Sequence, residues 1–219
     1  MKKPYLAGIC GASATGKSTF LRDLEKMMPE NSVCIVSQDN YYLPLEKQQL
    51  DENKKVNFDL PTSINRESFY TDLQKLISGE QVQIQEYTFN SPLKRPSSLT
   101  LKPAPIILIE GLYVFYFEEI RELLDLKVYL DAKDEVKLQR RLKRDVEERG
   151  YLEESVLYQW HHHVVPSYLQ YLSPHRDNSD MIIPTNISYD KGLEVLVNHF
   201  KYLLQQTFKW DISKTQSPA

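Results

Sequence analysis

The stretch that decides the fold is Gly8–Phe20, GICGASATGKSTF, close to the start of the chain. It matches the pattern G-x-x-x-x-G-K-[ST] through Gly11, Gly16, Lys17 and Ser18. An apolar strand pattern precedes the loop and a helical pattern begins at Ser18, which is the setting of a phosphate-binding loop. Small residues let backbone N–H groups converge on phosphate oxygens, and the helix N-terminus adds its dipole.

The chemistry of this loop predicts that it binds a nucleoside triphosphate. Lys17 supplies a positive charge for the β- and γ-phosphates, and the Ser18 hydroxyl suits Mg²⁺. A glycine-rich turn without a ligand is the alternative, and the complete motif in its strand–turn–helix setting argues against it. The loop residues that we expect to contact ATP are Gly11, Ala12, Ser13, Ala14, Thr15, Gly16, Lys17, Ser18 and Thr19.

Other features of the sequence restrict the class of nucleotide-binding protein to which the chain can belong. A switch GTPase needs the guanine-reading pattern N-K-x-D, but Asn53-Lys54 continues as Lys55-Val56. A motor or transporter ATPase is usually larger. A small-molecule kinase remains, and it needs a base near the acceptor hydroxyl.

Apolar strand patterns recur along the chain and alternate with helical spacing. The strand patterns are Tyr5–Cys10, Val33–Ser37, Ile106–Ile109, Leu126–Leu130 and Met181–Ile183. Helical stripes lie between them, one of which is formed by Leu138, Leu142 and Val146. Short, non-alternating strands separated by helices predict an α/β fold with a parallel sheet covered on both faces.

Two segments break this rhythm and predict additions to one domain that spans residues 1–209. Residues 81–102 hold short alternating segments and several prolines, which predict an inserted β-hairpin flap. Residues 140–160 include the arginine-rich run RRLKRDVEERG, which predicts either a mobile lid over phosphates or an ordinary solvated helix face. We expect residues 210–219 to form a flexible tail.

Composition restricts the class of protein. Of the 219 residues, 41% are hydrophobic, and 27 Lys and Arg face 30 Asp and Glu, for a formal net charge of −3. This balance does not suggest a general binder of nucleic acid or of membrane surfaces. Cys10 and Cys34 lie in apolar runs, which favours buried free thiols in a reducing compartment. With no apolar run near the roughly 20 residues that cross a bilayer, we expect a cytoplasmic protein.

Two carboxylates are placed for chemistry at strand ends. Asp39 follows the second strand pattern and Glu110 closes the third. Functional groups of an open parallel sheet collect at the carboxyl ends of its strands, so Asp39 can accept a proton from an attacking hydroxyl. A buried acidic strand end such as Glu110 needs a cation or donors, and Mg²⁺ is one such partner. A turn or helix cap for Asp39, and local N–H partners for Glu110, are the structural alternatives.

The motifs together resemble the uridine kinases, a family in the same group as phosphoribulokinase. The phosphate loop is followed in order by SQDNYY, NFDLP, EYTFNS, LIEGLYVF, the segment around RRLKRDVEERG, and SDMIIP. The match runs from about Leu6 to Pro184, and the combined motifs are far more specific than the loop alone. The resemblance implies a P-loop NTPase-type three-layer fold with a five-stranded parallel sheet. It also implies that ATP with Mg²⁺ phosphorylates the 5′-hydroxyl of a pyrimidine nucleoside, most simply uridine or cytidine.

Residue roles are carried over from the resemblance by position. Asp39 resembles the general base, with Lys17 as the catalytic lysine of the loop. The Mg²⁺ contacts are Ser18, Glu110 and Asp39. The nucleoside contacts are Tyr42, Asp59, Tyr87, Phe89, Arg141 and Gln159. Arg144 and Arg149 resemble lid arginines that meet the phosphates of ATP. The family is commonly tetrameric, so the resemblance also implies a homo-oligomer.

Three positions depart from the family pattern. Ala14 stands where the loop usually has glycine, Pro92 where pyrimidine kinases commonly have a base-binding histidine, and Tyr151 where an arginine is common. Losing acceptor-side hydrogen bonds redirects specificity. The residues therefore leave open a kinase for another riboside, a sugar phosphate or a pantothenate-like alcohol, and a nucleotide-binding regulator with little transfer activity.

The run His161–His163 invites comparison with a metal site. Consecutive residues on a helix fan out around its axis, so three adjacent imidazoles do not readily converge on one ion. A partly exposed helix face is the interpretation that we prefer.

Overall fold

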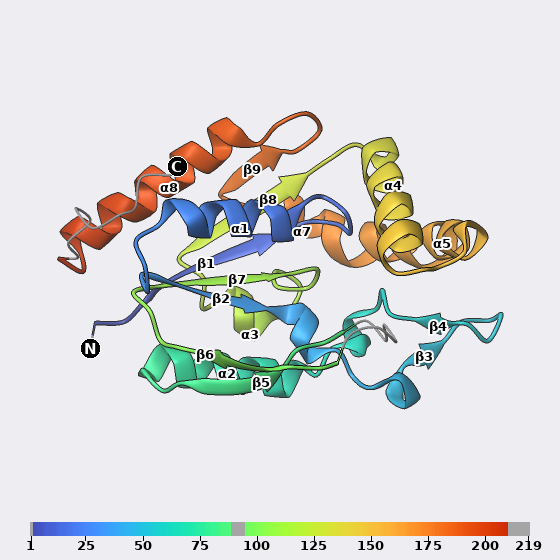
Figure 1. The fold of residues 1–219 in the computed structure, drawn as a ribbon, viewed down its shortest axis with the longest axis horizontal. Helices are drawn as coiled ribbons and strands as arrows, with labels where there is room; N and C mark the ends of the chain where they lie inside the picture. Colours follow the sequence, from blue (N-terminus) through green and yellow to red (C-terminus); the bar gives the residue numbers. More distant parts are fainter. Residues whose placement is uncertain (1, 89–94, 210–219) are drawn as a thin grey trace.

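A five-stranded parallel sheet forms the centre of the protein (Figure 1), as shown by a computed structural model that describes residues 2–88 and 95–209. The strand order is β2-β7-β1-β8-β9, and every neighbouring pair is parallel. The strands are β1 (Tyr5–Cys10), β2 (Val33–Ser37), β7 (Ile106–Gly111), β8 (Leu126–Asp131) and β9 (Met181–Pro184). The expected α/β fold is therefore confirmed, and β7 runs two residues beyond the apolar run that ends at Ile109, to Gly111.

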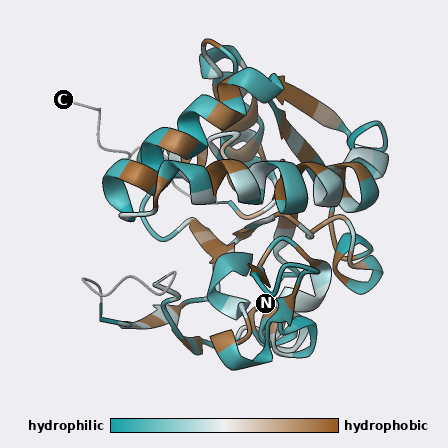
Figure 2. Cartoon of the chain, turned by 90° about the vertical axis from the view of Figure 1, so that its right-hand side faces the viewer, coloured by the Kyte–Doolittle hydropathy of each residue, from teal (hydrophilic) through white to brown (hydrophobic). Residues whose placement is uncertain are grey.

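Helices cover both faces of the sheet (Figure 1). On one face lie α1 (Lys17–Met27) and α8 (Asp190–Gln206), and on the other lie α2 (Arg66–Ser78) and α3 (Glu118–Arg121). The helices are two-sided, with apolar stripes toward the sheet and polar stripes outward (Figure 2). Strand β7 serves both cores because its side chains alternate: Leu108 packs with α1 and α8, whereas Ile107 and Ile109 pack with α2.

A chain of short helical segments follows β8. They are α4 (Asp134–Lys143), α5 (Glu153–Gln159), α6 (Val165–Ser167) and α7 (Ser173–Arg176), joined by π-helical turns at Arg144–Glu148, Trp160–Val164 and Tyr168–Leu172. The stripe of Leu138, Leu142 and Val146 indicated a helix, and this region is helical, but the stripe is not its most buried face. Val146 is 38% exposed, while Lys137 and Arg141 are the buried residues of α4. Arg141 lines a cleft, whereas the Lys137 ammonium lies over the Tyr168 ring.

Two hairpins stand apart from the sheet. The expected one pairs β5 (Val82–Gln85) with β6 (Ser98–Leu101), and the tip between them lies outside the described residues. The second pairs β3 (Gln49–Leu50) with β4 (Val56–Asn57) and was not predicted, because two-residue strands leave no periodic signal. Short 3₁₀ turns complete the described elements at Gln38–Tyr41, Leu45–Lys47 and Pro61–Ser63.

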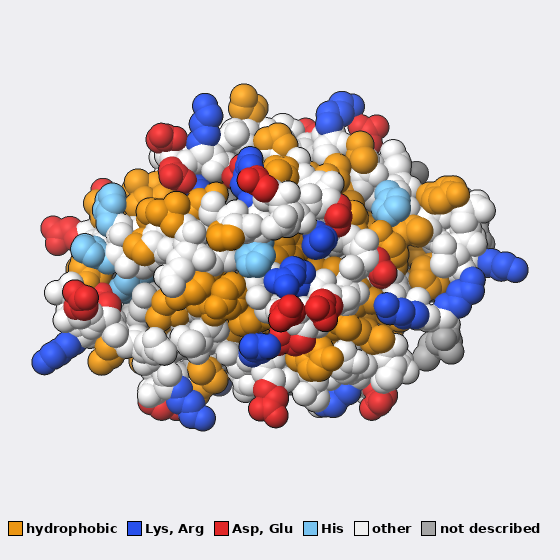
Figure 3. Space-filling model, turned by 180° about the vertical axis from the view of Figure 1, so that it is seen from behind, with side chains coloured by type: hydrophobic (Ala, Val, Ile, Leu, Met, Phe, Trp, Pro, Cys, Tyr) orange, Lys and Arg blue, Asp and Glu red, His pale blue; other side chains and the backbone are white. Residues whose placement is uncertain are grey.

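The surface and the cysteines agree with the composition. On the face shown in Figure 3, acidic and basic side chains are interspersed among apolar ones. Cys10 and Cys34 are both buried and free. Within residues 2–88 and 95–209, no helix combines the length and the apolar character that a membrane span requires.

Candidate active site

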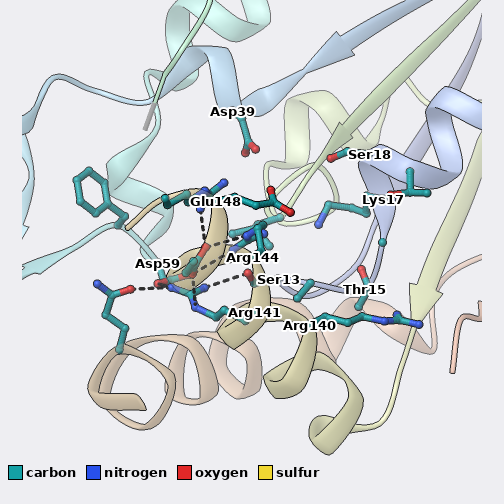
Figure 4. A pocket seen from close by; sticks show the side chains of 18 of the residues that line it. Ser13, Thr15, Lys17, Ser18, Asp39, Asp59, Arg140, Arg141, Arg144 and Glu148 are labelled. Carbon is teal, nitrogen blue, oxygen red and sulfur yellow. Dashed lines mark hydrogen bonds and ion pairs between the residues drawn. The ribbon is translucent and has the colours of Figure 1, made fainter. Parts of the chain in front are cut away.

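A cleft of about 620 Å³ opens at the carboxyl ends of the strands, between the phosphate loop, the β3–β4 hairpin and helices α4 and α5 (Figure 4). The predicted site residues that line it are Ser13, Ala14, Thr15, Gly16, Lys17, Ser18, Thr19, Asp39, Tyr42, Asp59, Tyr87, Glu110, Arg141, Arg144, Arg149 and Gln159. Gly11 and Ala12 lie behind this surface, and Phe89 and Pro92 fall outside the described residues. The fold thus brings together residues from almost the whole chain.

The phosphate loop is shaped by backbone conformations that few residues tolerate. A Cβ on Gly11 would lie 2.4 Å from the Leu130 carbonyl oxygen, so only glycine fits there. Gly16 has φ +94 and caps α1 without a side-chain hydrogen bond. Ala14 adopts φ +63, a left-handed conformation that costs an L-residue roughly 1–2 kcal/mol. The loop therefore holds a conformation suited to glycine although this chain carries alanine.

The start of α1 is prepared for an anion. Its first-turn N–H groups have no capping side chain, and the first turn contains no acidic residue. Lys17 Nζ donates to the carbonyl oxygens of Gly11 at 2.9 Å and Ala12 at 3.3 Å, which holds the ammonium group over the loop. Behind the loop, Thr185 Oγ1 donates to the Thr15 carbonyl oxygen at 2.8 Å and ties the loop to the end of β9. These are the donors and the positive charge that bind a polyphosphate.

Asp39 and Glu110 face Lys17 in the same cleft. Figure 4 shows the Asp39 carboxylate and the Lys17 ammonium directed into one space. Burial raises the pKa of Asp39, and the positive charge of Lys17 opposes that rise. Burial, followed by the charge of Asp39, raises the pKa of Glu110 to about 7. Ser37 Oγ donates to Glu110 Oε1 at 2.5 Å, and this bond partly offsets the rise.

This carboxylate pair fits a divalent cation. Glu110 is buried and Asp39 is partly buried, and the charge of Asp39 raises the pKa of Glu110, so the pair creates a demand for positive charge. Mg²⁺ prefers oxygen ligands and usually takes one or two carboxylates together with phosphates and water. Ser18 contributes a hydroxyl at the same end of the cleft. The donor set of Ser18, Asp39 and Glu110 therefore suits Mg²⁺ together with a phosphate chain.

The arginines of the predicted lid converge on one buried carboxylate, Asp145. Its Oδ1 accepts from Arg144 Nε at 2.8 Å and from Arg149 Nη1 at 3.1 Å, and its Oδ2 lies 3.3 Å from Arg141 Nε. Burial raises the pKa of Asp145, but the hydrogen bond and charge of Arg144 and the charges of the other two arginines lower it below its ordinary value. The guanidinium groups of Arg144 and Arg149 are thereby held at the wall of the cleft.

Arg141 connects the two ends of the cleft. Nη1 donates to Ser13 Oγ of the phosphate loop at 2.9 Å, and Nη2 donates to Gln159 Oε1 at 2.8 Å (Figure 4). Asp59 Oδ2 lies 3.9 Å from Nη2, with both side chains largely buried. One guanidinium group thus contacts the phosphate loop, the Gln159 amide and the Asp59 carboxylate.

Aromatic rings from Tyr42, Phe58 and Tyr87 line part of the cleft. The Tyr42 ring lies 5.1 Å from that of Tyr87 and 6.1 Å from that of Phe58, measured between centroids. The backbone N–H of Tyr87 donates to Asn40 Oδ1 at 3.0 Å, which fixes the start of the flap beside the Asp39 turn. Aromatic faces at such spacing suit a flat ring system.

Sequence reasoning missed part of the lining. The lining residues outside the predicted set are Arg22, Val56, Phe58, Leu112, Arg140, Asp145, Glu148, Tyr151, His163 and Tyr189. The i,i+4 spacing of Asp145 from Arg141 and Arg149 was an available signal. The view of His161–His163 as a partly exposed face holds for the first two but was wrong for His163. This side chain is buried and bonded to Asp51, because the β3–β4 hairpin covers it.

Comparisons with known proteins agree with this geometry. The sequence model of the Phosphoribulokinase / Uridine kinase family matches residues 6–190. A uridine kinase of Clostridium botulinum is 32% identical over 206 residues, covering 94% of this chain and 100% of that protein. Uridine-cytidine kinase A of Dictyostelium discoideum is 33% identical over 206 residues, and the chain spans only 41% of its length.

A solved structure shares the fold. The structure of a possible uridine kinase from Bacillus stearothermophilus has a TM-score of 0.55 at 19% identity, covering 83% of this chain and 89% of that one. The family model covers most of the chain, and the phosphate loop, the paired carboxylates and the arginine cluster share one cleft. The chain therefore belongs to the Phosphoribulokinase / Uridine kinase family.

Proposed function

We propose that this protein transfers the γ-phosphoryl group of ATP to the 5′-hydroxyl of uridine or cytidine. The observation that carries the proposal is the position of Asp39 in one cleft with Lys17 at the phosphate loop and Asp59 at the acceptor side. The relatives named uridine kinase and uridine-cytidine kinase support the choice of acceptor. The two buried free thiols suit the reducing cytoplasm in which we expect the protein to act.

The phosphate end acts by positioning and charge. The N–H groups at the start of α1 and the Lys17 ammonium bind the β- and γ-phosphates, and Arg144 and Arg149 approach from the opposite wall. Ser18, Asp39 and Glu110 would hold Mg²⁺, which would supply positive charge against the phosphates when bound. Phosphoryl transfer needs little covalent participation from the protein, so these charges supply most of the catalysis.

The acceptor end supplies a base and an orientation. Asp39 accepts the proton of the attacking 5′-hydroxyl, and its raised pKa makes it a stronger base than an exposed aspartate. The Asp59 carboxylate binds the ribose hydroxyls, held in place by Arg141. Tyr42, Tyr87 and Phe58 pack against the base. Burial and the nearby charge of Asp39 raise the pKa of the Tyr42 phenol well above its ordinary value, so Tyr42 acts as a neutral ring.

Acceptor-dependent ADP release tests the proposal. Purified protein with ATP and Mg²⁺ is assayed with uridine, cytidine, adenosine, ribose and pantothenate, and phosphorus NMR identifies the product. We expect uridine or cytidine to raise ADP release at least tenfold and to yield a 5′-monophosphate. Stimulation by a non-nucleoside alcohol alone would instead indicate another acceptor. ATP binding without any acceptor-dependent turnover would indicate a nucleotide-binding regulator.

A further inference from the structure

A network around Asp51 joins the β3–β4 hairpin to the helical segment that follows α5. Asp51 Oδ1 accepts the backbone N–H groups of Asn53 at 2.9 Å and Lys55 at 2.8 Å, which shapes the hairpin turn. Asp51 Oδ2 accepts from the Tyr158 hydroxyl at 2.6 Å and bonds His163 Nε2 at 2.7 Å. The carboxylate is therefore saturated, and it links the hairpin that precedes Asp59 to the far wall of the cleft.

This network determines which nitrogen of His163 carries a proton. The hydrogen bond from Tyr158, assisted by those from His163 and the backbone, holds the pKa of Asp51 below its usual range. An ionised carboxylate only accepts hydrogen bonds, so His163 Nε2 must donate. In the neutral imidazole, Nδ1 is then left as a hydrogen-bond acceptor.

Gln159 has an equally defined orientation. Its amide faces Arg141 Nη2 at 2.8 Å, and because a guanidinium has no acceptor, the facing atom is the oxygen Oε1. The Gln159 Nε2 group is therefore a donor. His163 follows Gln159 by four residues on the same helical segment, and both line the cleft although His163 is only 2% exposed. Gln159 and His163 thus place a donor and an acceptor on the same wall of the cleft.

We propose that Gln159 and His163 read the base of the acceptor nucleoside as a donor–acceptor pair, with Asp51 as the residue that sets the tautomer of His163. The inference rests on the proposed function. Uracil presents a carbonyl oxygen beside N3–H, and cytosine presents N3 beside its amino group, so either base complements the pair. A base without an N–H on this edge leaves His163 Nδ1 without a partner, at a cost in affinity.

The first test replaces His163 by phenylalanine and compares uridine with 3-methyluridine, which lacks the N3–H. We expect wild-type protein to prefer uridine at least tenfold in kcat/KM. In His163→Phe, kcat/KM for uridine should fall about tenfold while the value for 3-methyluridine changes less than about twofold. The control is His162→Phe, because His162 stacks on Tyr158 but does not line the cleft. An equal fall for both nucleosides would overturn the proposal and leave His163 a purely structural residue.

The second test keeps the imidazole and changes its tautomer. In Asp51→Asn, the backbone N–H groups of Asn53 and Lys55 still need an acceptor, so the side-chain oxygen of the new asparagine stays on their side. The NH₂ group of the asparagine then faces His163. Nε2 must then accept and Nδ1 becomes a donor. Two adjacent donors match N3 and O2 of cytosine but no edge of uracil, so the uridine-to-cytidine ratio of kcat/KM should fall about tenfold. A ratio within twofold of wild type would refute the tautomer argument even if stability changes.

The two proposals fail in different ways. Turnover of uridine or cytidine by wild-type protein tests the function itself. If wild-type protein phosphorylates neither nucleoside, the proposed function is wrong, and the proposed contact of Gln159 and His163 with the base is wrong as well. If wild-type protein phosphorylates both and the ratios stay unchanged in the variants, only the inference about His163 is refuted.

Discussion

Replacing Glu110 by glutamine should remove a pH dependence of folding stability. The Glu110 carboxyl is 5% exposed, and burial together with the charge of Asp39 raises its pKa from 4.5 to about 7. Each pKa unit corresponds to about 1.36 kcal/mol, so the change amounts to roughly 3 kcal/mol. Below pH 4.5 the group is protonated in both the folded and the unfolded chain and contributes no difference.

The direction of the pH effect on stability depends on whether Glu110 ionises at lower pH in the unfolded or in the folded protein. Between about pH 4.5 and 7, Glu110 is ionised in the unfolded chain but protonated in the fold, so unfolding becomes easier as the pH rises. Above pH 7 the carboxylate is ionised in both states, and the full loss of roughly 3 kcal/mol is reached. Glutamine cannot ionise. Glu110→Gln should therefore match wild type near pH 5 and exceed it by up to roughly 3 kcal/mol near pH 8.

Urea unfolding followed by circular dichroism, without nucleotide or metal, measures this effect. Wild type and Glu110→Gln are compared at about pH 5 and about pH 8, so that changes in other groups cancel between the two proteins. Glu194→Gln is the matched control because that side chain is 55% exposed and pairs with the exposed Lys191. Equal losses of unfolding free energy in wild type and Glu110→Gln between the two pH values would refute the reasoning.

Other substitutions probe the remaining parts of the cleft. Asp39→Asn should lower kcat about 10²-fold or more while ATP binding, measured by calorimetry, stays nearly unchanged; near-normal turnover would remove its role as base. Asp59→Asn should raise the acceptor KM more than it lowers kcat, and an unaltered KM would dismiss the ribose contact. Arg141→Ala removes the guanidinium beside buried Asp59 and leaves Asp145 with two of its three arginines, so it should cost about 3 kcal/mol or more in urea unfolding, whereas exposed Lys191→Ala should cost under about 0.5 kcal/mol. Ala14→Gly should raise the unfolding free energy by roughly 0.5–1 kcal/mol because it relieves the left-handed strain, and a loss would contradict that account.

Local sequence patterns predicted the central strands, the phosphate loop and the flap hairpin of this protein. Strands β1 and β2 have the bounds that their apolar runs indicated, and the phosphate loop follows β1 as its motif requires. The flap hairpin was predicted from short alternating segments and prolines. Periodicity and loop chemistry are properties of neighbouring residues, so they can be read without knowing the fold. The roles carried over from the family stay predictions until the substitutions above are measured.

The tertiary structure alone decided which polar groups became buried partners. The stripe of Leu138, Leu142 and Val146 indicated one face of α4, but Arg141 faces the cleft because Ser13, Asp59 and Gln159 receive its guanidinium there. The histidine run was likewise undecidable from its spacing. His163 is buried because a hairpin more than a hundred residues earlier in the sequence brings Asp51 to it. Local sequence patterns therefore determined the sheet and the phosphate loop. The burial of Arg141 and His163 depends on contacts between residues far apart in the sequence, which no local pattern records.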